Sequence, residues 1–381
     1  MTLLEILICE FKNADQSMIL KDNCLYKKVL FFLLIFFSIN TVVFACNNTK
    51  KYYTYLHKAE EAIIDDDFDV ASKNYIKAFT FLEYPFPNDL LVASICMLKS
   101  KDYDIQLLKK WNHLYSFQKN NTIEEKIQEM DLYIGTSYHS LLAQNLWEVI
   151  SKNSENTASI DSTVRKICKE IHQKDQGIRH EMDEQFGVEK YWIPEARKQI
   201  IKVDSLNLVL IDSIISLENF SEYIVGDYGI GIIFLSFLHN AAWQKQEVYN
   251  VSEKIKSLVK NGKIDNRRFA YTFDRFCDFI SADKDSTLHC VRGYYYAEGM
   301  YWVYDEYRTY INYNVSEADI INKRREKLFL SPLHLWVKQL NYQIKKENLF
   351  FIRSKEWGDL TEEFLLEKKI LIEKGELGII K

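Results

Sequence analysis

The chain has 381 residues, 47% of them hydrophobic and 27% charged, which predicts a folded protein with room for two domains. Its 49 basic and 54 acidic residues give a formal net charge of -5 without a Lys/Arg block, which argues against nucleic acid as a partner. Only 12 glycines and 4 prolines interrupt the chain, and so few helix breakers predict an all-α fold.

The N-terminal region has the order of a secretory signal, which we predict over residues 1–45 with Met18 as an alternative start. Two lysines precede an apolar run over residues 29–43, and small residues follow it; a single membrane anchor is the alternative interpretation. Cys46 directly after Ala45 resembles the lipid-attachment site of bacterial lipoproteins, so lipid anchoring and simple secretion are both open. In either case we expect an exported protein, periplasmic or held in the cell envelope.

Four cysteines follow Cys46 in the sequence. Their wide spacing indicates neither a disulfide framework nor a CxxC metal site, so we predict core positions with room for one bridge. These residues are Cys96, Cys168, Cys277 and Cys290.

Residues 46–150 have the pattern of helical hairpins. Asp67-Phe68-Asp69, followed by Tyr75 and Ala78, resembles the second helix of a tetratricopeptide repeat, and Asp102-Tyr103-Asp104 recurs close to the period of about 34 residues of that family. The resemblance implies a groove for a protein or peptide partner. The alternative is a helical layer that only shields the next domain.

A polar segment at residues 151–159 marks a domain boundary, and we predict a helical domain over residues 151–310. Its first helix carries an apolar stripe from Ile160 to Met182, in which Asp175 takes one of the apolar places. A carboxylate on a buried stripe needs a partner, and Arg179 lies one helical turn away.

Three further helices carry the same anomaly. Residues 200–217 bear Asp204 and Asn207 on apolar rows, a helix that follows three glycines bears His239, and a helix after Gly262 bears a further polar pair, Asp274 and Arg275. Because buried polar groups need partners, we predict that these residues meet in one cluster.

The motifs that carry this cluster resemble an uncharacterised bacterial family, a domain of unknown function. They are Asp175-Gln176-Gly177-Ile178-Arg179, Asp204 with Asn207, His239 at the end of an apolar helix, and Ala270 ahead of Asp274-Arg275. The resemblance covers residues 160–296. Two places depart from the family pattern: Cys290-Val291-Arg292-Gly293 replaces a tyrosine-glycine motif, and Asn240-Ala241 follows His239. The family has no established reaction, so the resemblance implies a site and leaves its chemistry and any cofactor open.

Three interpretations of the cluster remain. In a catalytic pocket, His239 would be a general base oriented by a carboxylate of Asp175, Asp204 or Asp274, and Arg179 or Arg275 would bind an anionic group, with Asn207 as a further ligand contact. A metal variant would use His239 with the three aspartates. The third interpretation, which we favour, is a buried ion-pair network that fixes the helix packing.

The aromatic residues at 294–310 are a platform for a carbohydrate or peptide, or part of the core. Residues 311–381 predict further helices without chemical motifs. Two functions follow. The first is an envelope binding or scaffold protein; the alternative is a hydrolase-like enzyme that uses His239.

Overall fold

The described residues of this computed structural model are helical and contain no strand, which confirms the all-α prediction. They are residues 45–101, 104–119, 162–187, 191, 193–241, 245–281 and 315–345. The chain divides into two compact units, Met1–Asn47 and Asn48–Lys381, and the described part of the first unit, residues 45–47, is helical. The following paragraphs concern the second unit, in which the predicted boundary at residues 151–159 lies outside the described residues.

The second unit begins with four consecutive helices, over residues 48–64, α4 (Phe68–Ala78), α5 (Pro87–Lys99) and α6 (Ile105–Lys119). The Asp67 side chain caps α4 by accepting the backbone N–H of Val70, and Pro87 stands at the first turn of α5, where its missing N–H costs nothing. Helix α4 packs on α5, and α5 packs on α6, around a core rich in tyrosine and phenylalanine. The described residues of this region are thus mainly helical, and the helix expected to open at residues 122–125 lies outside the described residues.

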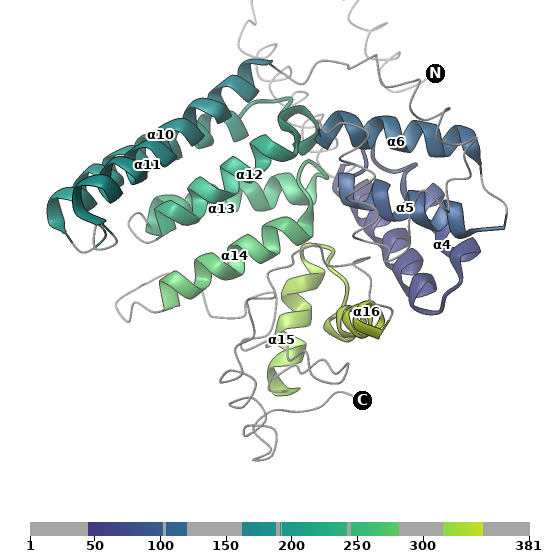
Figure 1. Cartoon of the computed structure of the whole chain (residues 1–381). Coiled ribbons are helices and arrows are strands. Elements are labelled where there is room, and N and C mark those ends of the chain that lie inside the picture. The colour runs from purple at the N-terminus through teal and green to yellow at the C-terminus, as the bar shows by residue number, and fades with distance from the viewer. Residues whose placement is uncertain are drawn as a thin grey trace, which may run out of the picture. The chain divides into compact units, whose positions relative to one another are not determined.

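The next described part of the chain forms five helices that pack side by side (Figure 1). They are α10 (Ser162–Phe186), α11 (Pro194–Ile215), α12 (Glu222–Ala241), α13 (Lys245–Lys260) and α14 (Asn266–Ser281). Helix α12 contacts α10, α11, α13 and α14, and also α6 of the preceding layer. It is the most apolar of the five because it is covered on several sides.

Helix α12 is interrupted at the first of the three glycines that the sequence analysis places ahead of it. Its range begins at Glu222, but the backbone is not helical at Gly226, where φ is 74°, so the uninterrupted helix follows Gly226 as predicted. Gly229 and Gly231 lie inside this helix, and a Cβ atom at Gly229 would stand 2.4 Å from Cγ1 of Val225. Among the described residues, α12 is the one helix long and apolar enough to cross a membrane. The most apolar 18-residue stretch of this helix is 61% buried inside the fold.

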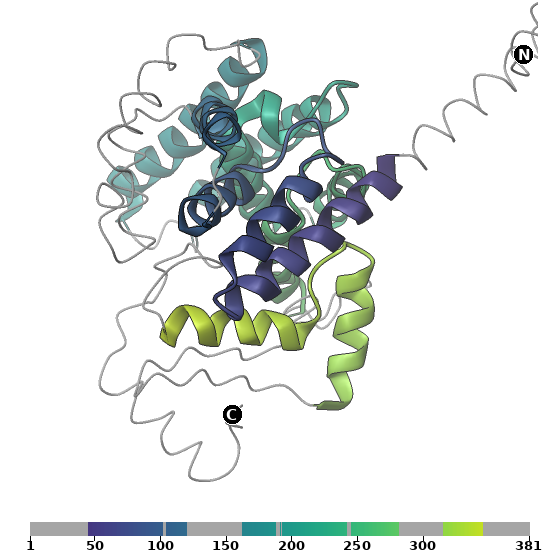
Figure 2. The same cartoon turned by 90° about the vertical axis from the view of Figure 1, so that its right-hand side faces the viewer.

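Two C-terminal helices, α15 (Val315–Glu326) and α16 (Leu333–Lys345), pack on each other and return the chain to the first layer (Figure 2). Gln339 donates a hydrogen bond to the Glu60 carboxylate at 2.8 Å, and the Tyr342 hydroxyl donates one to Asp66 at 2.8 Å. The last predicted helix, after residue 361, and the aromatic residues 294–310 lie outside the described residues.

Candidate functional site

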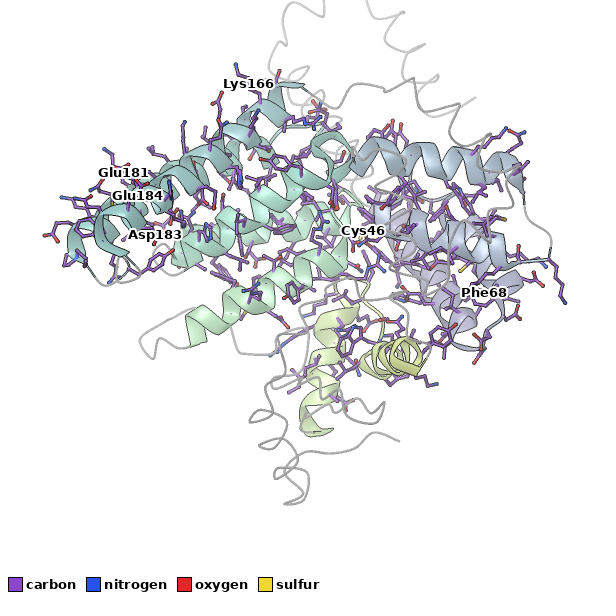
Figure 3. All side chains as sticks on the ribbon, viewed as in Figure 1. Cys46, Phe68, Lys166, Glu181, Asp183 and Glu184 are labelled. Carbon is purple, nitrogen blue, oxygen red and sulfur yellow. The ribbon has the colours of Figure 1, made fainter. Side chains whose placement is uncertain are left out.

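Four of the predicted polar residues meet where α10, α11 and α12 pack together. These residues, named here the polar cluster, are Asp175, Arg179, Asp204 and His239. Asp175 is buried because the apolar stripe of α10 faces the other two helices, and its side chain is 1% exposed. The outer face of α10 carries solvated carboxylates instead, among them Glu181, Asp183 and Glu184 (Figure 3).

Arg179 joins the two buried carboxylates of the polar cluster. Its Nη1 atom donates to Oδ1 of Asp175 at 2.7 Å, and its Nη2 atom lies 3.1 Å from both carboxylate oxygens of Asp204. The guanidinium is 11% exposed and the Asp204 side chain is 1% exposed. Arg179 therefore holds α10 and α11 together through charge-assisted hydrogen bonds, and the atoms proposed to bind an anionic ligand are engaged by the protein's own carboxylates.

His239 completes the polar cluster from α12. Its Nδ1 atom lies 2.8 Å from Oδ1 of Asp175, and its side chain is 25% exposed. Gln176 donates a hydrogen bond to the other Asp175 oxygen at 2.6 Å, which gives the second residue of the DQ motif a structural role. One carboxylate thus orients a histidine, an arginine and a glutamine at the same time.

The two carboxylates differ in their pKa shifts. Burial alone raises the pKa of Asp175, but the hydrogen bond and charge of His239 and the Arg179 guanidinium together bring it below its ordinary value. Burial raises the pKa of Asp204, and Arg179 only partly offsets this effect. Asp175 is therefore ionised at neutral pH, and since an ionised carboxylate can only accept hydrogen bonds, the contact at 2.8 Å places a proton on Nδ1 of His239.

The other three predicted site residues have different surroundings. Asn207, one turn after Asp204 on α11, is 0% exposed, and neither polar atom of its side chain has a hydrogen-bond partner among the described residues. Asp274 is half-buried on α14. Arg275 is exposed, and its guanidinium carbon lies 5.9 Å over the ring centre of Tyr271, so its charge faces the surface rather than a buried anion.

A second ion-pair network was missed by the sequence analysis. Arg267 forms ion pairs with Glu60, Asp89 and Asp265, and so connects the start of α14 to the first layer. Burial raises the pKa of Glu60 to about 7, although the Arg267 charge opposes this shift. Adjacent arginines at the start of an amphipathic helix were the available signal, but two of the partners of Arg267, Glu60 and Asp89, lie 207 and 178 residues away in the chain.

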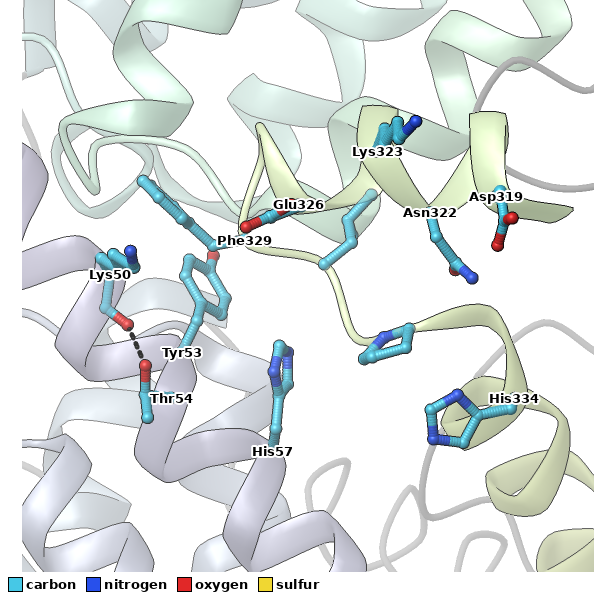
Figure 4. Close-up of a pocket in the computed structure, with 12 residues that line it drawn as sticks. Lys50, Tyr53, Thr54, His57, Asp319, Asn322, Lys323, Glu326, Phe329 and His334 are labelled. Carbon is cyan, nitrogen blue, oxygen red and sulfur yellow. Dashed lines mark hydrogen bonds between the residues drawn. The ribbon is translucent and has the colours of Figure 1, made fainter.

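A pocket of about 700 Å³ opens between the first helix of the layer and the α15–α16 turn (Figure 4). The residues lining this aromatic pocket are Lys50, Tyr53, Thr54, His57, Asp319, Asn322, Lys323, Glu326, Phe329, Leu330, Pro332 and His334. The Tyr53 and Phe329 rings stack with centroids 6.3 Å apart and an interplanar angle of 25°. Burial and nearby arginines lower the pKa of His57 to about 3, so this histidine is neutral at physiological pH.

The rim of the aromatic pocket carries charges of both signs. Lys50, Asp319, Lys323 and Glu326 are exposed, and within the described part of the chain none of the four forms an ion pair. Two ammonium groups and two carboxylates are therefore available to a ligand, while the walls between them combine aromatic and apolar side chains with the polar side chains of Thr54, Asn322 and two histidines.

No protein-family model, curated protein or solved structure matches the chain. The resemblance to a bacterial domain of unknown function therefore stays a prediction, which rests on the order and spacing of its motifs.

Proposed function

We propose that this chain is an exported or lipid-anchored binding protein of the cell envelope, and that its aromatic pocket receives a peptide segment of a partner. The observation that carries the proposal is the pocket of about 700 Å³, a size typical of ligand sites, on the first helix of the N-terminal layer. Unpaired charges of both signs on its rim suit the backbone termini and charged side chains of a peptide. The half-buried Phe329 ring, which stacks on the buried Tyr53, suits an apolar or aromatic peptide side chain.

Export agrees with the cysteine chemistry. Cys277 is disulfide-bonded, whereas Cys46, Cys96 and Cys168 are free. Disulfides persist in the periplasm and outside the cell and are rare in reducing compartments. A free, half-buried Cys46 suits the proposed acylation. Mass spectrometry of Cys46 in the protein purified from bacterial membranes tests the anchor, and an unmodified mature N-terminus at this residue would favour simple secretion.

Pocket binding can be tested by thermal-shift screening with a library of short peptides. Thr54→Trp places an indole on the pocket wall, and Glu61→Trp places the same group at an exposed site of the same helix outside the pocket. We expect peptides that stabilise the wild type and Glu61→Trp but not Thr54→Trp. Peptides that stabilise all three proteins equally would contradict the pocket proposal.

The hydrolase-like alternative is favoured by one specific observation. The buried Asp175 carboxylate orients His239 at 2.8 Å while a quarter of the histidine side chain stays exposed, which is the arrangement of a general base. Chromogenic esters and phosphate esters provide an assay. Hydrolysis by the wild type that His239→Gln abolishes, without loss of helical content, would support this alternative, and equal rates for both proteins would exclude it.

A further inference from the structure

The polar cluster contains the donor atoms of a cation site. Asp175, Asp204 and His239 each offer one ligand atom, and these atoms lie within 4.8 Å of one another. Two donors that each stand about 2.1 Å from one metal ion are at most about 4.2 Å apart. The donors would thus need to approach one another by less than about 1 Å, which side-chain rotation provides.

Asn207 provides an independent observation. Its carboxamide is fully buried, and within the part of the chain that the structure describes neither its oxygen nor its nitrogen has a hydrogen-bond partner. Buried polar groups in native proteins almost always have a partner, so an orphan carboxamide requires an explanation. Asn207 lies three residues after Asp204 on α11, which places the two side chains at neighbouring positions of one helix face. A carboxamide oxygen next to a buried carboxylate is a typical further ligand for a cation.

Burial restricts what can enter the polar cluster. The side chains of Asp175 and Asp204 are 1% exposed, and only Arg179 and His239 reach solvent, at 11% and 25%. A metabolite or peptide does not fit between such carboxylates without separating the helices. A metal ion does, because it needs only the space that its donors enclose.

Charge also favours a cation at this place. The two buried carboxylates share a single guanidinium, which carries one positive charge. A divalent ion in place of that guanidinium balances both carboxylates. An imidazole binds a metal ion through one ring nitrogen and carries a proton on the other. Carboxylate and carboxamide oxygens combined with imidazole suit a borderline transition-metal ion.

We propose that Asp175, Asp204, His239 and Asn207 bind a divalent transition-metal cation, which displaces the Arg179 guanidinium toward solvent. Arg179 then acts as the resident cation of the metal-free form and preserves the spacing of the two carboxylates. The proposal goes beyond peptide binding, because it concerns a different site from the aromatic pocket.

Titration of the full-length chain with MnCl2 in a calorimeter tests the metal site without any assumption about activity. We expect one Mn²⁺ ion per chain, at least 10-fold weaker binding to Asp204→Asn, and at least 10-fold tighter binding to Arg179→Met, which lacks the competing guanidinium. His180→Ala is the matched control, because His180 is 77% exposed on α10 and pairs only with the exposed Glu184 at 3.2 Å. Its affinity for Mn²⁺ should equal that of the wild type.

Asn207→Leu gives a second variant that does not remove a charge and therefore keeps the test valid if Asp204→Asn fails to fold. The metal site predicts at least 10-fold weaker binding of Mn²⁺ to Asn207→Leu. Wild-type protein without saturable Mn²⁺ binding would overturn the proposal, as would unchanged Mn²⁺ affinity in the folded Asp204 and Asn207 variants. Neither result would affect peptide binding at the aromatic pocket.

Discussion

Replacing Arg179 with methionine removes the guanidinium that joins the two carboxylates of the polar cluster. The variant loses the hydrogen bond to Asp175 at 2.7 Å and both contacts to Asp204 at 3.1 Å, and it leaves two carboxylates that are 1% exposed without compensation. Removing one partner of a buried ion pair costs about 3 to 5 kcal/mol. Because Arg179 keeps 11% of its surface exposed, water screens it slightly, and we expect a loss near the lower limit, about 3 kcal/mol.

Urea denaturation followed by circular dichroism measures this loss as a change in the free energy of unfolding. Lys254→Met is the matched control, since Lys254 pairs with Asp212 of α11 at 2.5 Å with the two side chains 48% and 40% exposed. Such a surface pair contributes at most about 1 kcal/mol. The double variant Arg179→Met with Asp204→Asn should lose about 1 to 3 kcal/mol less stability than the sum of the losses in the two single variants. Equal losses for Arg179→Met and Lys254→Met would refute the claim that the polar cluster is a buried network.

Three further outcomes follow from the structure. Gly229→Ala should destabilise the protein by about 1 to 3 kcal/mol, because the new Cβ atom would stand 2.4 Å from Val225 Cγ1. A Cβ atom at Gly231 has nothing within 4 Å, so Gly231→Ala should stabilise the protein by up to about 1 kcal/mol. Thermal melts measure both changes. Arg267→Met should cost at least about 3 kcal/mol in urea, and a loss below 1 kcal/mol would show that its three carboxylate partners are screened by water. His57 binds a proton in the unfolded chain below pH 6.5 but in the folded chain only near pH 3, so the stability of the protein should fall as the pH is lowered through this range. Thermal melts of His57→Gln should show a smaller fall with pH. An identical fall in the wild type and the variant would contradict the lowered pKa of His57.

The helices and the core of the polar cluster could be predicted from the sequence because both depend on local spacing. The apolar stripe of α10 places Asp175 on its buried side, and the interval of four residues brings Arg179 within 2.7 Å of it. The requirement that buried charges find partners then predicts that Asp204 and His239 join them. In the structure Asp204 contacts the Arg179 guanidinium, and His239 contacts the Asp175 carboxylate.

The rest depends on contacts between distant segments, for which one sequence carries no local signal. The aromatic pocket combines His57 with His334, and the second ion-pair network combines Glu60 with Arg267. The place of Gly229 inside α12 was not predicted, because glycines normally end helices, whereas here a Cβ atom at this position would clash with Val225 one turn earlier. The surface position of Arg275 depends on the rotation of α14 about its own axis. The sequence around Asp274, which is half-buried, does not determine this rotation.

The central claim, that the protein acts by binding a peptide in the aromatic pocket, is tested most directly by photo-cross-linking. A peptide selected by thermal shift would carry a photoreactive phenylalanine, and the cross-linked residues would be identified by mass spectrometry. The pocket predicts cross-links within residues 50–57 and 319–334, and their loss in Thr54→Trp. Cross-links elsewhere on the chain, unchanged in Thr54→Trp, would contradict the claim.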